Sequence, residues 1–98
     1  MKTKVIPITE VEIKTIKNRI NQNNNVNLVL DMRSASINET DLEEIFKFAD
    51  KSNRNGTTFV VVKENVDFDA FSQEWNIVPT IEEANDLISL DEMMRNLE

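Results

Sequence analysis

The sequence predicts an α/β domain: a compact sheet of about four mostly parallel strands with helices packed against it. Three observations predict this fold class. Short apolar runs alternate along the chain with segments whose apolar residues recur at helical spacing. A helical segment separates each strand candidate from the next, which is the pattern of parallel βαβ units. The length of 98 residues suits one domain, 1–98, and one glycine with two prolines argues against flexible linkers.

The first strand and helix are predicted from the N-terminal segment. Lys4–Ile8 alternates apolar and polar residues, and Pro7, which cannot donate a ladder hydrogen bond, favours an edge strand or a strand end. Thr9 and Glu12 have the spacing of a capping box, and the helix should end at the polar turn Asn21–Asn25. Its apolar stripe consists of Val11, Ile13, Ile16 and Ile20.

The second strand and helix follow this turn. Val26–Met32 is nearly all apolar, which predicts a central strand that is covered on both faces. Thr40 and Glu43 form a second possible capping box, and Gly56 offers a C-terminal stop for the helix. The apolar face of this helix consists of Leu42, Ile45, Phe46 and Ala49.

The third strand is predicted from Thr57–Lys63, which is rich in β-branched and aromatic residues. Phe68, Phe71 and Trp75 then suit one face of a short helix, and aromatic residues at this spacing usually belong to the core. Asn76–Pro79 predicts a short fourth strand.

The last helix should begin at Thr80, which forms a third capping box with Glu83, and should run nearly to residue 98. We expect Met94 and Leu97 to cover the sheet and Met93 to be half exposed, although Met93 and Met94 suit a partner surface as an alternative. The residues expected to point inward are Ile81, Ala84, Leu87 and Ile88.

The composition excludes several function classes. The chain has no cysteine and no histidine, so it lacks thiolate metal sites, cysteine nucleophiles and the commonest general base. We therefore expect no catalytic residues, no cofactor and no metal. A net charge of −7 repels phosphate backbones, which argues against nucleic acid as a partner. The chain shows no signal peptide and no membrane span, so we expect no membrane partner and a cytoplasmic location.

One loop concentrates the candidate functional residues. It connects the predicted central strand to the second helix, and its simplest role is to cap that helix through Asn38 or Thr40. Partner docking is an additional role, and catalysis has the least support because no base and nucleophile pair is visible. Asp31 and Arg33, just before it, are expected to pair or to cap locally, which is a structural role. The candidate docking residues are Ser34, Ser36, Asn38, Glu39, Thr40 and Asp41.

Three segments carry a resemblance to a known family. They are LVLDM (Leu28–Met32), LEEIFKFADKSNRNGTTFVVV (Leu42–Val62) and WNIVPTIEEANDLI (Trp75–Ile88). In their order and pattern the chain resembles the STAS domain of anti-sigma-factor antagonists and sulfate-transporter tails. Too few residues precede Val5 for the first strand of that family, so one sheet edge should be uncovered.

The resemblance implies a non-catalytic regulatory module that docks to a protein, such as an anti-sigma-factor-like kinase or another regulator. Aligned on Leu42, Asn38 matches the aspartate of the family's Asp-Ser-Ser-Gly-Leu motif. Glu39 matches its phosphoacceptor serine, Thr40 the second serine and Asp41 the glycine. A carboxylate would thus replace the serine phosphorylation switch with a fixed negative charge.

Some alternatives stay open. A small molecule, a nucleotide or another anion could bind at the strand ends, although the chain has no glycine-rich phosphate loop. The sequence does not decide whether Thr40 or a nearby serine is phosphorylated, and it leaves the oligomeric state unknown.

Overall fold

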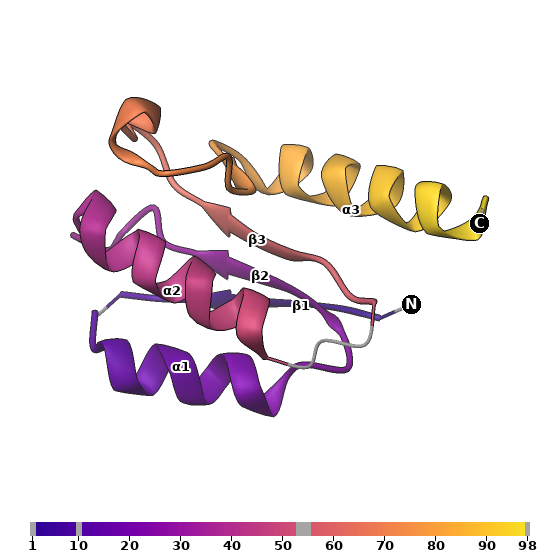
Figure 1. The fold of residues 1–98 in the computed structure, drawn as a ribbon, viewed down its shortest axis with the longest axis horizontal. Coiled ribbons are helices and arrows are strands. Elements are labelled where there is room, and N and C mark those ends of the chain that lie inside the picture. The colour runs from indigo at the N-terminus through magenta and orange to yellow at the C-terminus, as the bar shows by residue number, and fades with distance from the viewer. Residues whose placement is uncertain (1, 10, 53–55, 98) are drawn as a thin grey trace.

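The computed structural model describes residues 2–9, 11–52 and 56–97 (Figure 1). Over these residues the chain forms four strands, three α-helices and one short 3₁₀ helix. In chain order they are β1 (Thr3–Pro7), α1 (Ile13–Gln22), β2 (Asn27–Asp31), α2 (Glu39–Lys51), β3 (Phe59–Val62), η1 (Phe68–Ala70), β4 (Ile77–Val78) and α3 (Ile81–Asn96). The predicted α/β class and the predicted order of elements are confirmed.

All described strands are parallel and lie in the order β1-β2-β3-β4. Because right-handed crossovers that step in one direction place their helices on one face, α1 and α2 lie together on one side of the sheet. α3 returns alone across the opposite face (Figure 1). The carboxyl ends of the strands therefore share one edge of the molecule with the loop that opens α2.

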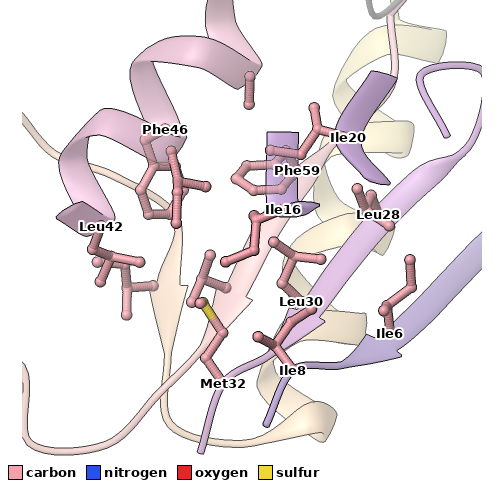
Figure 2. Close-up of a cluster of buried hydrophobic side chains, with 14 of the residues drawn as sticks. Ile6, Ile8, Ile16, Ile20, Leu28, Leu30, Met32, Leu42, Phe46 and Phe59 are labelled. Atoms are coloured by element: carbon pink, nitrogen blue, oxygen red, sulfur yellow. The ribbon is translucent and has the colours of Figure 1, made fainter. Parts of the chain in front are cut away.

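The strand β2 lies inside the sheet and is covered on both faces. Leu28, Val29 and Leu30 are fully buried, as predicted for a strand with helices on both faces. Leu28 and Leu30 belong to the larger apolar cluster between the sheet and the helices α1 and α2 (Figure 2). Val29 belongs to a smaller cluster under α3, together with Val60, Val62, Ala84 and Ile88.

The strand β1 forms an edge of the sheet. Asn27 N donates to Lys2 O at 2.9 Å and Ile8 N donates to Asp31 O at 2.8 Å, so the even-numbered residues of β1 bond to β2. Pro7 alternates with them and points its ring nitrogen toward the open edge, where the missing N–H costs no ladder bond. The predicted edge position of this proline is confirmed.

Two of the three predicted capping boxes are wrong. α1 begins after Glu12 and not at Thr9, and no side chain caps it. Of the two caps predicted for α2, Asn38 is confirmed as the N-cap, while Thr40 lies inside the first turn of a helix that begins at Glu39. The third prediction is confirmed, because Thr80 Oγ1 accepts a hydrogen bond from Glu83 N at 3.1 Å.

Helix ends also differ from the expectation. α1 extends through Gln22, so the polar turn covers only Asn23–Asn25. α2 ends at Lys51 with Ser52 as its C-cap, while the predicted stop at Gly56 lies beyond residues 53–55, which are outside the described residues. Gly56 has φ 77°, a left-handed value that glycine adopts without strain, and it serves the turn into β3.

The aromatic segment between β3 and β4 contributes less to the core than predicted. Phe71 and Trp75 pack partly against the larger cluster, but Phe68 is exposed and Trp75 lies beyond η1. Phe46 is the centre of the aromatic contacts. Its ring stacks on that of Trp75, with 5.1 Å between the ring centroids, and meets the Phe59 ring edge-on, with 5.2 Å between the centroids.

Polar contacts hold the second half of α3 against the sheet. Asn27 and Thr58 are buried at the amino ends of β2 and β3, and buried polar groups need partners. Asn27 Nδ2 donates to Glu92 Oε1 at 2.6 Å, and Thr58 Oγ1 donates to Asp91 Oδ2 at 3.2 Å. Arg95 Nη1 in turn donates to Thr58 Oγ1 at 3.0 Å. These contacts turn the polar side of the helix inward.

The expected cover of the sheet by Met94 and Leu97 is therefore wrong. Both side chains are exposed, as are Leu90 and Met93, because Asp91, Glu92 and Arg95 occupy the inward positions. Inward-facing apolar residues are confined to the first half of α3, where Ala84 and Ile88 are buried and Ile81 and Leu87 are partly buried.

A pair of leucine truncations tests this assignment. Leu30→Ala should lower the free energy of unfolding by about 2–5 kcal/mol, because it leaves a cavity in the larger cluster. Leu90→Ala, at a side chain that is 57% exposed, should change it by less than about 0.5 kcal/mol. Urea unfolding of dilute protein measures both values, and similar losses in the two variants would contradict the orientation of α3.

Candidate functional site

Alternate residues anchor the loop between β2 and α2. Ala35 is buried and Ile37 packs against the larger cluster. Ala35 N donates to Met32 O at 3.1 Å, and Lys63 Nζ, at the end of β3, donates to Ala35 O at 3.0 Å. A loop held by its backbone and by its apolar side chains loses little conformational entropy when a partner binds.

The polar residues of the loop point outward between these anchors. Ser34, Ser36, Asn38 and Thr40 are exposed. Glu39 and Asp41 are half-buried in the first turn of α2, where negative charge favours the positive end of the helix dipole. The structure therefore brings the predicted docking residues together on one edge of the molecule, at the carboxyl ends of the strands.

Asn38 is the residue that caps α2. Its Oδ1 accepts a hydrogen bond from Asp41 N at 2.8 Å, which satisfies one of the backbone donors that an N-terminus leaves open. The hydroxyl of Thr40, one of the two predicted caps, is consequently not needed for capping and stays at the surface.

Glu39 is tied to the crossover segment that connects β3 to β4. Its Oε2 accepts a hydrogen bond from Asp67 N at 3.3 Å. The carboxylate predicted as a fixed docking charge thus also positions a neighbouring segment, so a substitution that removes the acceptor would disturb both roles.

Glu43, one turn later, makes the stronger attachment to the same segment. Its Oε2 accepts hydrogen bonds from Ser72 N at 2.8 Å, Ser72 Oγ at 2.8 Å and Trp75 Nε1 at 3.0 Å. The bond from the Ser72 backbone, followed by those from the Trp75 and Ser72 side chains, lowers the pKa of Glu43. No sequence pattern pointed to this carboxylate beyond its place in the predicted capping box with Thr40.

The ion pair expected between Asp31 and Arg33 is present at the carboxyl end of β2. Arg33 Nε and Nη2 donate to Asp31 Oδ1 and Oδ2 at 2.9 and 2.8 Å, a bidentate pair. The side-chain hydrogen bonds from Arg33 lower the pKa of Asp31. The two charged side chains at this strand end therefore neutralise one another in an ion pair.

A groove on α2 extends the exposed loop surface. It has a volume of about 430 Å³, and Thr40, in the first turn of α2, is one of its lining residues. Lys17 of α1 pairs with Glu44 at 2.9 Å and lies over the Phe48 ring at 5.4 Å. The remaining lining residues are Glu43, Lys47 and Lys51, which give the groove both signs of charge.

Within the described residues, no group of three Asp or Glu side chains could hold a metal ion. None of the helices in that part of the chain combines the length and the apolar character that a membrane span requires. The loop itself presents hydroxyl, amide and carboxylate groups at the surface.

Comparison with family models, curated proteins and solved structures found no match. The resemblance to the STAS domain accordingly stays a prediction from the residues, and the site is judged from its own geometry.

A first prediction concerns the cap. Asn38→Ala should lower the free energy of unfolding by about 1 kcal/mol, because Asp41 N loses its acceptor. Thr40→Ala should change it by less than about 0.5 kcal/mol, since Thr40 is exposed and does not cap. Chemical unfolding ranks the two variants, and a larger loss in Thr40→Ala would contradict the assignment.

Another prediction concerns how the stabilising effect of Glu43 depends on pH. The lowered pKa means that ionised Glu43 stabilises the fold at neutral pH and that this contribution is lost as the pH falls through the folded-state value. The stability gap between the wild type and Glu43→Gln should therefore be largest near neutral pH and should narrow in acid.

Fluorescence of Trp75, the only tryptophan, reports urea unfolding directly at this contact. Asp86→Asn, at an exposed position of α3 beyond its first turn, is the control and should show no such narrowing. A gap for Glu43→Gln that is constant with pH would refute the role of the charge.

Proposed function

We propose that the protein is a non-catalytic regulatory module that docks to another protein through the loop Ser34–Asp41 and the adjoining outer face of α2. The observation that carries this proposal is the alternation within the loop. Ala35 and Ile37 insert into the core while Ser34, Ser36 and Asn38 point outward. Exposed polar residues on a rigid scaffold are typical of recognition loops.

The charges of this surface favour a partner with a basic contact residue. The chain carries a net charge of −7, and Glu39 and Asp41 add negative charge at the start of α2. A lysine or arginine of the partner would form a charge-assisted hydrogen bond with Glu39. Such charges chiefly set the association rate and the specificity of a complex.

The resemblance noted in the sequence suggests the class of partner: an anti-sigma-factor-like kinase or another regulator. Glu39 would then supply constant negative charge where the family carries a switchable serine. Thr40 offers a displaced acceptor for phosphorylation, because its hydroxyl is exposed and does not cap α2. A phosphate there would lie in the first helical turn, where the dipole favours anions.

Binding of a nucleotide or another anion at the strand ends has less support. Arg33 is paired with Asp31, and Lys63 Nζ donates to the backbone of Ala35. These two cationic side chains at the carboxyl edge of the described sheet therefore already have partners within the chain.

Cross-linked capture from the native cells, followed by titration of the captured partner, tests the proposal. Ser36→Arg places a bulky charge on the loop, and Ser89→Arg places the same group on the exposed flank of α3 as the control. The wild type and Ser89→Arg should retain a partner that Ser36→Arg loses.

Glu39→Gln isolates the contribution of charge, because the amide oxygen can still accept from Asp67 N. It should weaken the complex about tenfold, the equivalent of about 1.4 kcal/mol. Glu82→Gln on α3 should leave the affinity unchanged. Equal binding by the wild type and Ser36→Arg would place the docking surface elsewhere.

A further inference from the structure

The outer side of α3 carries an apolar surface that the fold does not use. Leu90, Met93, Met94 and Leu97 are 57–80% exposed, and we call them the C-terminal stripe. Their positions, three or four residues apart, line one side of a helix. In the described part of the chain no element lies on this side of α3, which stands alone above its face of the sheet (Figure 1).

The orientation of this stripe is fixed by the contacts beneath the helix. Glu92 and Asp91 accept hydrogen bonds from Asn27 and Thr58, and Arg95 donates to Thr58. Rolling the helix to bury the stripe would break these contacts and leave the buried Asn27 and Thr58 without these partners, which is costly. The described elements of the fold therefore cannot bury the stripe, and its burial requires another surface.

The sequence of the stripe is its own mirror image. Residues 90–97 read LDEMMRNL, so leucine and methionine occupy the same positions from either direction. A two-fold axis between Met93 and Met94 brings Leu90 against Leu97 of a second copy, and Met93 against Met94. This self-complementarity is the condition for an isologous contact between identical subunits.

The charges select the antiparallel arrangement. Glu82, Glu83 and Asp86 are exposed on the first half of α3, and the guanidinium of Arg95 is turned inward. Two parallel helices would place these acids opposite one another. In the antiparallel pair they lie outside the paired stretch 90–97, and the two helix dipoles oppose one another.

We infer that the C-terminal stripe is a dimerisation surface, on which α3 of a second copy packs antiparallel about an axis between Met93 and Met94. The surface is independent of the proposed docking loop, which lies at the carboxyl ends of the strands. A contact between two eight-residue stretches buries much less area than a standard interface, which buries about 800 Å² per partner. We therefore expect a weak dimer that forms at high protein concentration. Because each copy carries a charge of −7, salt screens their repulsion and strengthens the dimer.

Sedimentation equilibrium from about 10 μM to about 1 mM tests this inference in the range expected of a weak complex. The wild type should shift from monomer to dimer, and added sodium chloride should move the transition to lower concentration. Met94→Glu should stay monomeric, while Ser89→Glu, which adds the same charge on the flank of the helix, should behave like the wild type.

A pair of charge variants tests the register itself. Met93→Lys and Met94→Glu should each be monomeric alone, yet mixed they should form a heterodimer, because Lys at 93 faces Glu at 94 only in the antiparallel pair. Circular dichroism should confirm that both variants remain folded.

Each contrary result overturns a specific element of the proposed dimer: its occupant, its contact surface or its register. A wild type that stays monomeric to about 1 mM, even in high salt, excludes the second copy as occupant and leaves the stripe to a different protein. Dimerisation that Met94→Glu does not weaken places the contact elsewhere. Failure of the mixed variants to associate refutes the antiparallel register.

Discussion

The fold depends on the burial of β2 at the centre of a parallel sheet. A strand with apolar side chains on both faces must be covered from both sides, yet the crossovers through α1 and α2 lie on the same side. The opposite face is left to α3, which runs back from the end of β4. That helix covers β2 and β3 but leaves Val5 of β1 partly exposed, and its own outer side meets no other described element. Because two helices cover one face of the sheet and a single helix covers the other, one face of β1 and the outer side of α3 stay exposed.

Hydrogen bonds connect the loop between β2 and α2, the helix α2 and the segment between β3 and β4. Glu39 and Glu43 project from successive turns of α2 and bind Asp67, Ser72 and Trp75 of that segment. Lys63, from the strand that precedes the segment, reaches back to Ala35 in the loop. The long connection to a strand of only two residues is thereby fixed against the same helix that the loop opens. A partner bound to the loop would meet a surface that is already ordered.

The sequence predicted the fold well because hydrophobic periodicity reflects burial directly. The strand Val26–Met32 and the inward face of α2 were recognised from their apolar residues alone. The caps were predicted less well, since a capping box is a short pattern that also arises from residues with other tasks. Thr40 and Glu43 have its spacing, but Asn38 already caps the helix, and Glu43 binds residues some thirty positions further along the chain.

The second half of α3 shows the same limit. Its apolar residues lie at helical spacing, which correctly predicted a helix but not which side faces the sheet. The choice was made by two polar residues, Asn27 and Thr58, whose burial at the strand starts could not be inferred from an apolar pattern. The predicted docking residues do lie together, because a strand-to-helix loop in a parallel sheet emerges at the carboxyl edge.

The central claim is that the loop between β2 and α2 is an ordered platform for a partner. Amide hydrogen exchange, resolved residue by residue across 32–41, tests it most directly. The account predicts slow exchange at Ala35 and Asp41, whose N–H groups donate to Met32 O and Asn38 Oδ1, and fast exchange at the outward-facing Ser36. Unprotected exchange at Ala35 and Asp41 alike would show a mobile loop and would contradict the claim.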